Sequence, residues 1–245
     1  MTTVKPPISR PPSKPAASDQ LHVRLPPGSR LQLRRGQSLA VDRIASDETL
    51  RVERGCLVMQ ATADQQGHRS VLLVLLPGDI IVREVAPPLP GVALVAALPS
   101  ALSRATATGG AADGALNCAA FAKLTARVAL HTLALGALDA EQRAVTFLVE
   151  LALRIGHHTP SGCTFELPLS RTDMARFLAL NPDTMSRIMS RLRERKLIAM
   201  PSRGLASVPD IEALAALTPL APVLRRMWPE SECAVALQAS TPPQA

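Results

Sequence analysis

The segment from residue 170 to residue 196 constrains the fold more than any other part of the chain, because two helical patterns meet there across a very short turn. Ser170 indicates the start of the first helix. Asn181 followed by Pro182 indicates the start of the second, since Asn caps a helix and Pro suits its first turn. An apolar face with the spacing i, i+3, i+4, i+7 follows, formed by Met185, Ile188, Met189 and Leu192. The pattern is that of a helix-turn-helix, and the alternation around residues 201–204 predicts a winged hairpin behind it.

The opposite face of the second helix carries side chains that suit the edges of DNA bases. Arg187 can donate two hydrogen bonds to guanine, and Asp183 can accept one from cytosine. The alternatives are a surface ion pair for Arg187 and complementation of the helix dipole for Asp183. The predicted DNA contacts from the two helices and the wing are Ser170, Arg171, Thr172, Asp183, Thr184, Ser186, Arg187, Ser190 and Arg203.

The charge distribution agrees with a polyanion partner. The net charge is +7, and residues 169–204 hold eight Lys or Arg against three Asp or Glu. Such a compact basic segment favours a nucleic-acid site over a merely solvated charged face. Aromatic residues make up only 2% of the chain, which argues against modules that stack single-stranded bases on aromatic rings. No motif of a hydrolase, kinase or metalloprotease is present, so nothing in the sequence indicates an enzyme.

The N-terminal part reads as short strands separated by turns. Residues 1–18 are rich in Pro, Ser and Lys and are expected to form a disordered tail. Residues 19–113 contain several β-type runs, with Gly36, Gly55, Gly67 and Gly78 expected in the gaps between them. Many short strands with glycine-containing turns are typical of a sandwich or barrel-like roll. At the other end, residues 219–245 show weak periodicity and are expected to be a loose tail.

Between these parts, residues 114–138 are rich in Ala and Leu and predict one long helix. Apolar residues recur there in steps of three and four, as in the seam of a coiled coil. The seam predicts a homodimer, and the alternative is a helix packed only on its own β domain. Asp139 then caps a further helix, which opens a DNA-binding domain over residues 139–218. The seam consists of Phe121, Leu124, Val128, His131 and Leu135, followed by Leu138.

The segment ELPLSRTDMARFLALNPDTMSRIMSRLRERKLI resembles the recognition helix-turn-helix of the Crp/Fnr family of bacterial transcription regulators, and weaker similarity extends over about residues 30–215. The resemblance implies an α+β fold with an N-terminal β-roll like a cyclic-nucleotide-binding domain, a long dimerisation helix and a C-terminal winged helix-turn-helix. It also implies a homodimer on a palindromic promoter site, with RNA polymerase as a partner. By this similarity Asp183, Ser186 and Arg187 would read bases, Asp183 standing where oxygen-responsive members often carry Glu.

Departures from the family pattern bear on the effector. Family members that bind cyclic nucleotides hold the ribose with a Glu and the phosphate with an Arg. Here Gly78-Asp79 is followed by a Pro- and Gly-rich stretch where that Arg should lie, and a buried phosphate would lack its counter-charge. No cysteine precedes Cys56, so the cluster of the iron–sulfur members is not expected either. No cofactor is predicted, and haem bound through His131 is the alternative.

Three further expectations complete the sequence-based interpretation. Cys163 lies in a Gly/Pro/Ser-containing loop, where exposure would allow it to report oxidation. Ala179 and Lys196 stand where the family usually has Gly, so both turns are expected to be slightly shifted. The scattered cysteines and the four prolines in the longest uncharged run, residues 85–103, favour a cytoplasmic protein without a membrane partner. A protein-interaction module that keeps the fold without reading DNA is the alternative function.

Overall fold

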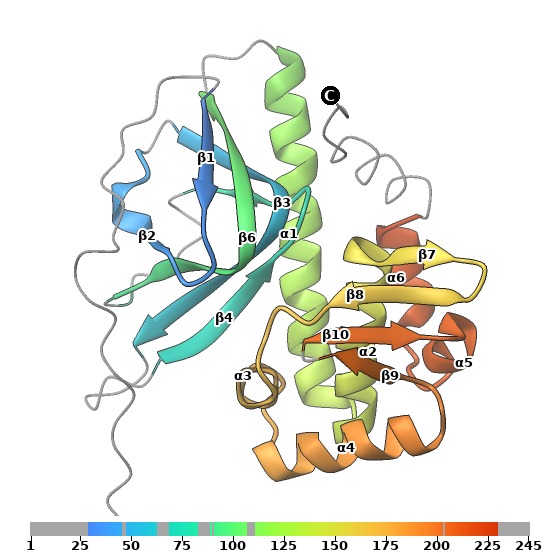
Figure 1. Ribbon diagram of the computed structural model, residues 1–245. Helices are drawn as coiled ribbons and strands as arrows, with labels where there is room; N and C mark the ends of the chain where they lie inside the picture. The colour runs from blue at the N-terminus through green and yellow to red at the C-terminus, as the bar shows by residue number, and fades with distance from the viewer. Residues whose placement is uncertain are drawn as a thin grey trace, which may run out of the picture.

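The computed structural model describes residues 29–45, 48–62, 69–82, 89, 91–106, 111–202 and 204–229. A β domain is followed by one long helix, which runs beside a C-terminal domain of short helices and a small sheet (Figure 1). This arrangement confirms the predicted α+β class with a roll, a long helix and a winged helix-turn-helix. The expected tail over residues 1–18 and the expected turn at Gly67 lie outside the described residues.

The β domain is an antiparallel sheet with the strand order β1-β6-β3-β4, in which β2 also pairs with β6 and β5 with β3. Its core is aliphatic and includes Leu50, Leu57 and Leu102. The strand β6 comes from the uncharged run that carried no specific strand prediction. The elements are β1 (Arg30–Leu33), β2 (Ser38–Ala40), a 3-10 turn (Val41–Arg43), β3 (Glu48–Thr62), β4 (Arg69–Leu75), β5 (Ile80–Ile81) and β6 (Ala93–Thr106).

Gly55 does not lie in a gap between two strands, as the sequence suggested, but within the continuous strand β3. The register between β3 and β6 shifts around this glycine, which has a φ of +88°. A Cβ atom built there would lie 2.2 Å from the carbonyl oxygen of Pro99. The glycine is therefore required by a bulge that bends β3. The sequence correctly indicated a backbone conformation that favours glycine, but this conformation occurs within a strand and not in a turn between strands.

The long helix α1 (Ala111–Ala137) only partly follows the predicted seam. Leu124 is 2% exposed and belongs to the core of the roll, so its assignment to a dimer contact is wrong. His131 stacks on Phe177 of the same chain, with ring centroids 4.2 Å apart. Phe121 and Val128 are 46% and 45% exposed, so the roll does not cover these two neighbours of Leu124.

The C-terminal domain contains more regular structure than the sequence suggested. Its small sheet has the order β7-β8-β10-β9, so the wing pairs with a hairpin that precedes the helix-turn-helix. Residues 221–227, expected to belong to a loose tail, form α6, and Trp228 behind it is buried. The elements are α2 (Ala140–Ile155), β7 (His157–Thr159), β8 (Gly162–Glu166), α3 (Arg171–Phe177), α4 (Pro182–Glu194), β9 (Ala199–Ser202), β10 (Leu205–Val208), α5 (Ile211–Ala215) and α6 (Ala221–Met227).

The expected exposure of Cys163 is also wrong. The residue lies in β8 with 1% of its surface exposed, and its backbone pairs with both β7 and β10. Burial raises the pKa of the Cys163 thiol to about 11. The thiolate is the reactive form of cysteine, so this side chain is protected twice, by lack of access and by protonation.

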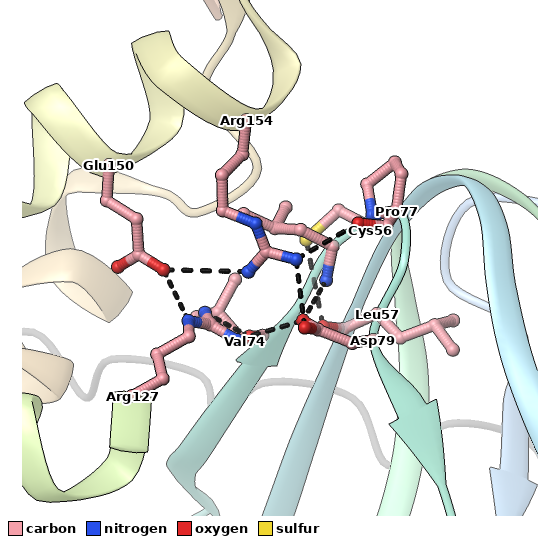
Figure 2. A network of polar contacts seen from close by, with 9 residues as sticks. Cys56, Leu57, Val74, Pro77, Asp79, Arg127, Glu150 and Arg154 are labelled. Atoms are coloured by element: carbon pink, nitrogen blue, oxygen red, sulfur yellow. Dashed lines mark hydrogen bonds and ion pairs between the residues drawn. The ribbon is translucent and has the colours of Figure 1, made fainter. Parts of the chain in front are cut away.

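A buried network of ion pairs joins the roll to α1 and α2 (Figure 2). Asp79, in the turn before β5, accepts from Arg127 of α1 and from Arg154 of α2, each at 2.9 Å. Both arginines also pair with Glu150 of α2. On the far side of the network, the guanidinium of Arg154 lies 4.9 Å from the ring centroid of Trp228. Three separate parts of the chain therefore meet at four charged side chains.

The electrostatics of this network favour its charged form. Burial alone would raise the pKa of Asp79, but Arg154 and Arg127 outweigh it and hold that pKa below its usual value. Burial likewise opposes the charge on Arg127, whereas Glu150 and Asp79 raise its pKa. Asp79 also accepts a hydrogen bond from the backbone N–H of Leu76 at 2.8 Å. Two carboxylates thus balance two guanidinium groups, and the β-roll is fixed against the domain that follows.

Candidate nucleic-acid interface

The helices α3 and α4 begin at side-chain caps that the sequence indicated. The hydroxyl of Ser170 accepts from the backbone N–H of Asp173 at 3.1 Å, and the side-chain oxygen of Asn181 accepts from the N–H of Asp183 at 2.8 Å. Such caps satisfy N–H groups that have no partner inside the helix. The predicted apolar face of α4 is buried and consists of Met185, Ile188, Met189 and Leu192. The opposite face of α4 is therefore turned outward.

Each of the two turns that flank α4 contains a non-glycine residue in the left-handed backbone conformation. Ala179 has a φ of 52° and Lys196 a φ of 58°. A Cβ-bearing residue in this region costs about 1 kcal/mol, so both turns are held by contacts elsewhere. For the first turn those contacts come from α2, since Nη1 of Arg143 donates to the carbonyl oxygens of Leu178 and Ala179 at 3.0 and 3.3 Å.

The structure brings Asp183 and Arg187 together on the outer face of α4, one helical turn apart and both exposed. Neither side chain makes a hydrogen bond or ion pair with any residue whose position is described. Thr184, Ser186 and Ser190 are half-buried beside them. Ser190 additionally accepts a hydrogen bond from Nη2 of Arg193 at 3.1 Å.

Three of the other predicted contact residues lie at the start of α3. Arg171 and Thr172 are exposed at the start of α3. The hydroxyl of Ser170, beside its capping role, donates to Oδ2 of Asp173 at 2.6 Å. Arg203, predicted at the tip of the wing between β9 and β10, lies outside the described residues.

A groove of about 570 Å³ runs between α4 and the start of α2, and the sequence did not predict it. Thr184, Arg187 and Arg191 line one side, and residues 139–142 line the other. Asp139 caps α2 with a reciprocal pair of hydrogen bonds to Gln142, as the sequence suggested in part. Arg191 belongs to the basic segment seen in the sequence. Its position beside the groove becomes clear only once the structure shows how α4 packs against the start of α2.

The part of the chain with described positions contains neither a metal-binding cluster nor a membrane-spanning helix. Within those ranges, no three or more His, Cys, Asp and Glu side chains are grouped so as to hold a metal ion. None of the helices described there combines the length and the apolar character needed to cross a bilayer.

Comparison with known proteins finds similarity to a known domain over part of the chain. Residues 142–217 match the Crp-like helix-turn-helix domain. The chain is 38% identical over 92 residues to the nitrogen fixation regulation protein FixK of Rhizobium meliloti, which covers 38% of this chain and 42% of that protein. The chain therefore matches less than half the length of this relative.

Two solved structures share the fold across both domains. FixK2 from Bradyrhizobium japonicum superposes with a TM-score of 0.58 at 21% identity, covering 78% of this chain and 97% of that chain. A transcriptional regulator of the CRP family from Thermus thermophilus gives a TM-score of 0.63 at 17% identity, covering 76% and 95%. The chain therefore shares the fold of these two structures across the roll, the long helix and the winged helix-turn-helix, and residues 142–217 match a Crp-like helix-turn-helix domain.

Proposed function

We propose that this protein is a homodimeric regulator of transcription that binds a palindromic DNA site through α4. The observation that carries the proposal is the exposed pair Asp183 and Arg187, which lies on the outer face of α4 and has no partner among the described residues. A guanidinium left free in this way can donate two hydrogen bonds to the O6 and N7 atoms of guanine, and a carboxylate can accept from cytosine N4. Ser186, on the same helix, suits either a base or a phosphate.

The surroundings of α4 suit a phosphate backbone. Thr184 lines the groove beside α4, and the exposed side chains of Arg171 and Thr172 lie at the start of α3. Contacts of this kind fix the register of a protein on DNA, whereas base contacts carry the sequence information. RNA polymerase, bound beside the same promoter, is the further partner that we propose.

The proposed dimer contact is the exposed side of α1, and it differs from the predicted seam because Leu124 is buried in the roll. Phe121 and Val128 are large apolar side chains seven residues apart on α1, and they are 46% and 45% exposed. Exposed apolar groups along one helix are typical of an interaction surface. Of the five predicted seam residues, Phe121 and Val128 therefore carry this proposal, together with the half-buried Leu135.

Replacing Val128 by glutamate is expected to convert the dimer to a monomer. Two carboxylates would face each other across the two-fold axis, which costs several kcal/mol and weakens the dimer about 100-fold or more. Sedimentation equilibrium over a range of protein concentrations measures the change. Ala126→Glu is the control, because residues two apart on a helix point to different sides. A Val128→Glu protein that stays dimeric at low micromolar concentration would place the interface elsewhere.

We also propose that the regulator acts without cyclic AMP and without an iron–sulfur cluster. The segment in which the phosphate-binding Arg would be expected lies mostly outside the described residues. Arg127 is the buried arginine that α1 presents to the roll, and Asp79 and Glu150 already neutralise it. A cyclic phosphate there would have to displace one of these carboxylates. Haem remains the alternative effector group, although His131 is packed against Phe177.

Selection from a randomised duplex library tests the proposed function directly. The purified protein is incubated at about 0.1–0.15 M salt, where nonspecific phosphate binding is already weakened, and bound duplexes are sequenced. Enrichment of a palindrome with half-sites about one helical turn apart is the expected result. Failure to enrich any sequence, with or without added cyclic AMP or haem, would instead favour the protein-interaction alternative.

A further inference from the structure

Glu141, the second residue of α2, joins Arg191 of α4 to Arg195, the C-cap residue that follows α4. Its Oε2 atom accepts from Nη1 of Arg191 at 2.6 Å, and its Oε1 atom accepts from Nη1 of Arg195 at 2.9 Å. Residues four apart on a helix lie on one side, so both guanidinium groups reach the same carboxylate. One acidic side chain thus orients two basic ones, and it does so from a different helix.

This arrangement contributes little to folding. Arg191 and Arg195 are 57% and 45% exposed, and Glu141 is 22% exposed. Ion pairs with this much solvent contact are screened and add little to stability. The buried network around Asp79 already fixes α2 against the rest of the chain. The contribution of Glu141 must therefore be sought at the surface, where its two partners lie.

That surface is the flank of α4 which borders the groove. Arg187, Arg191 and Arg195 follow one another at intervals of four residues, and the first two line the groove itself. Without Glu141 they would form a stripe of three uncompensated positive charges. Such a stripe attracts the phosphates of any duplex, whatever its sequence, because phosphate attraction carries no sequence information.

The start of α2 also contacts both ends of α4. Arg143 holds the turn before α4 through the carbonyl oxygens of Leu178 and Ala179, and Glu141 holds the last turn of α4 through Arg191 and Arg195. We propose that Glu141 is a specificity-determining residue, which neutralises and orients Arg191 and Arg195 so that Arg187 alone on this flank is free to bind DNA. The inference rests on the proposed function, because it concerns how the same face discriminates among duplexes.

Glu141→Gln tests the inference with little change in side-chain size. Glu212→Gln is the matched control, because Glu212 forms a comparable exposed pair with Arg225 at 2.6 Å and lies on α5, outside the groove. Binding to a duplex of unrelated sequence is measured as a function of salt. We expect Glu141→Gln to bind it several-fold more tightly at about 0.1 M salt, with a slope of log affinity against log salt steeper by up to about 2 per protomer. Glu212→Gln should match the wild type.

Elution from immobilised heparin gives a readout that needs no operator. Glu141→Gln is expected to elute at higher salt than both the wild type and Glu212→Gln, with an unchanged midpoint of thermal unfolding. Equal elution of the two variants would overturn the inference, because net charge alone would explain it. Weaker binding by Glu141→Gln at an unchanged salt slope would overturn it too, since that is the mark of a structural role. If Glu141→Gln elutes at higher salt as expected but the wild type selects no palindrome from the duplex library, the proposed function is refuted and the inference about Glu141 is not.

Discussion

Replacing Asp79 by alanine is expected to lower the free energy of unfolding by about 3–5 kcal/mol, the usual cost of removing one partner from a buried ion pair. Arg127 and Arg154 would keep Glu150 as their shared counter-charge and would leave one buried positive charge uncompensated. Urea unfolding measures the loss as a lower midpoint at an unchanged slope. The exposed Asp42 provides the control, and its replacement by alanine should cost little.

The pH dependence of this variant gives an independent check. Arg154 and Arg127 hold the pKa of Asp79 below its usual value. Its contribution to stability is therefore complete above the ordinary aspartate pKa of about 4, and it is lost as the pH falls through the lower pKa of the folded state. The difference between wild type and Asp79→Ala should shrink in acid. A cost under about 1 kcal/mol at neutral pH would show that the network does not hold the domains together.

Arg187→Ala is expected to abolish sequence-specific binding while leaving the dimer intact. A bidentate contact between arginine and guanine contributes about 1–3 kcal/mol of discrimination, so a dimer that loses one such contact in each half-site loses about 2–6 kcal/mol. The measurement is a titration of the selected palindrome against a duplex in which the contacted guanines are changed. Wild type should separate the two duplexes, and Arg187→Ala should bind both with nearly equal affinity.

The matched control for Arg187 is Arg225→Ala. That variant removes the same charge from an exposed arginine of α6, which pairs with Glu212 and does not line the groove. It should keep the preference for the palindrome. If Arg187→Ala lowered the affinity for every duplex by the same factor, Arg187 would be a phosphate contact, and the assignment of base reading would pass to Asp183 and Ser186.

The sequence determined the helix-turn-helix well because its signals are local. Asn181, Pro182 and the apolar spacing of α4 act within one or two turns, so the exposed positions of Asp183 and Arg187 could be foreseen. The groove could not, because it depends on where the start of α2 lies against α4. Glu141 is separated from Arg191 by 50 residues and gives no signal of its own in the sequence.

The errors elsewhere have the same physical origin. A helical repeat shows that Leu124 and Val128 lie on one side of α1, but it does not show which part of that side the roll covers. Cys163 follows a Gly and a Ser and looks like part of a loop, whereas pairing of β8 with two other strands buries it. Trp228 and α6 lie in a stretch of weak periodicity, and their order comes from packing on the hydrophobic core of the C-terminal domain.

The contact between Trp228 and Arg154 has a practical consequence. The chain contains one tryptophan and no tyrosine, so its ultraviolet emission on excitation near 295 nm comes from a single known position. That indole lies against a guanidinium which also pairs with the roll through Asp79. Any signal that separates the roll from the C-terminal domain would change the surroundings of this fluorophore. The wild-type protein therefore carries its own optical reporter of the joint between its domains, and candidate effectors can be screened without an attached label.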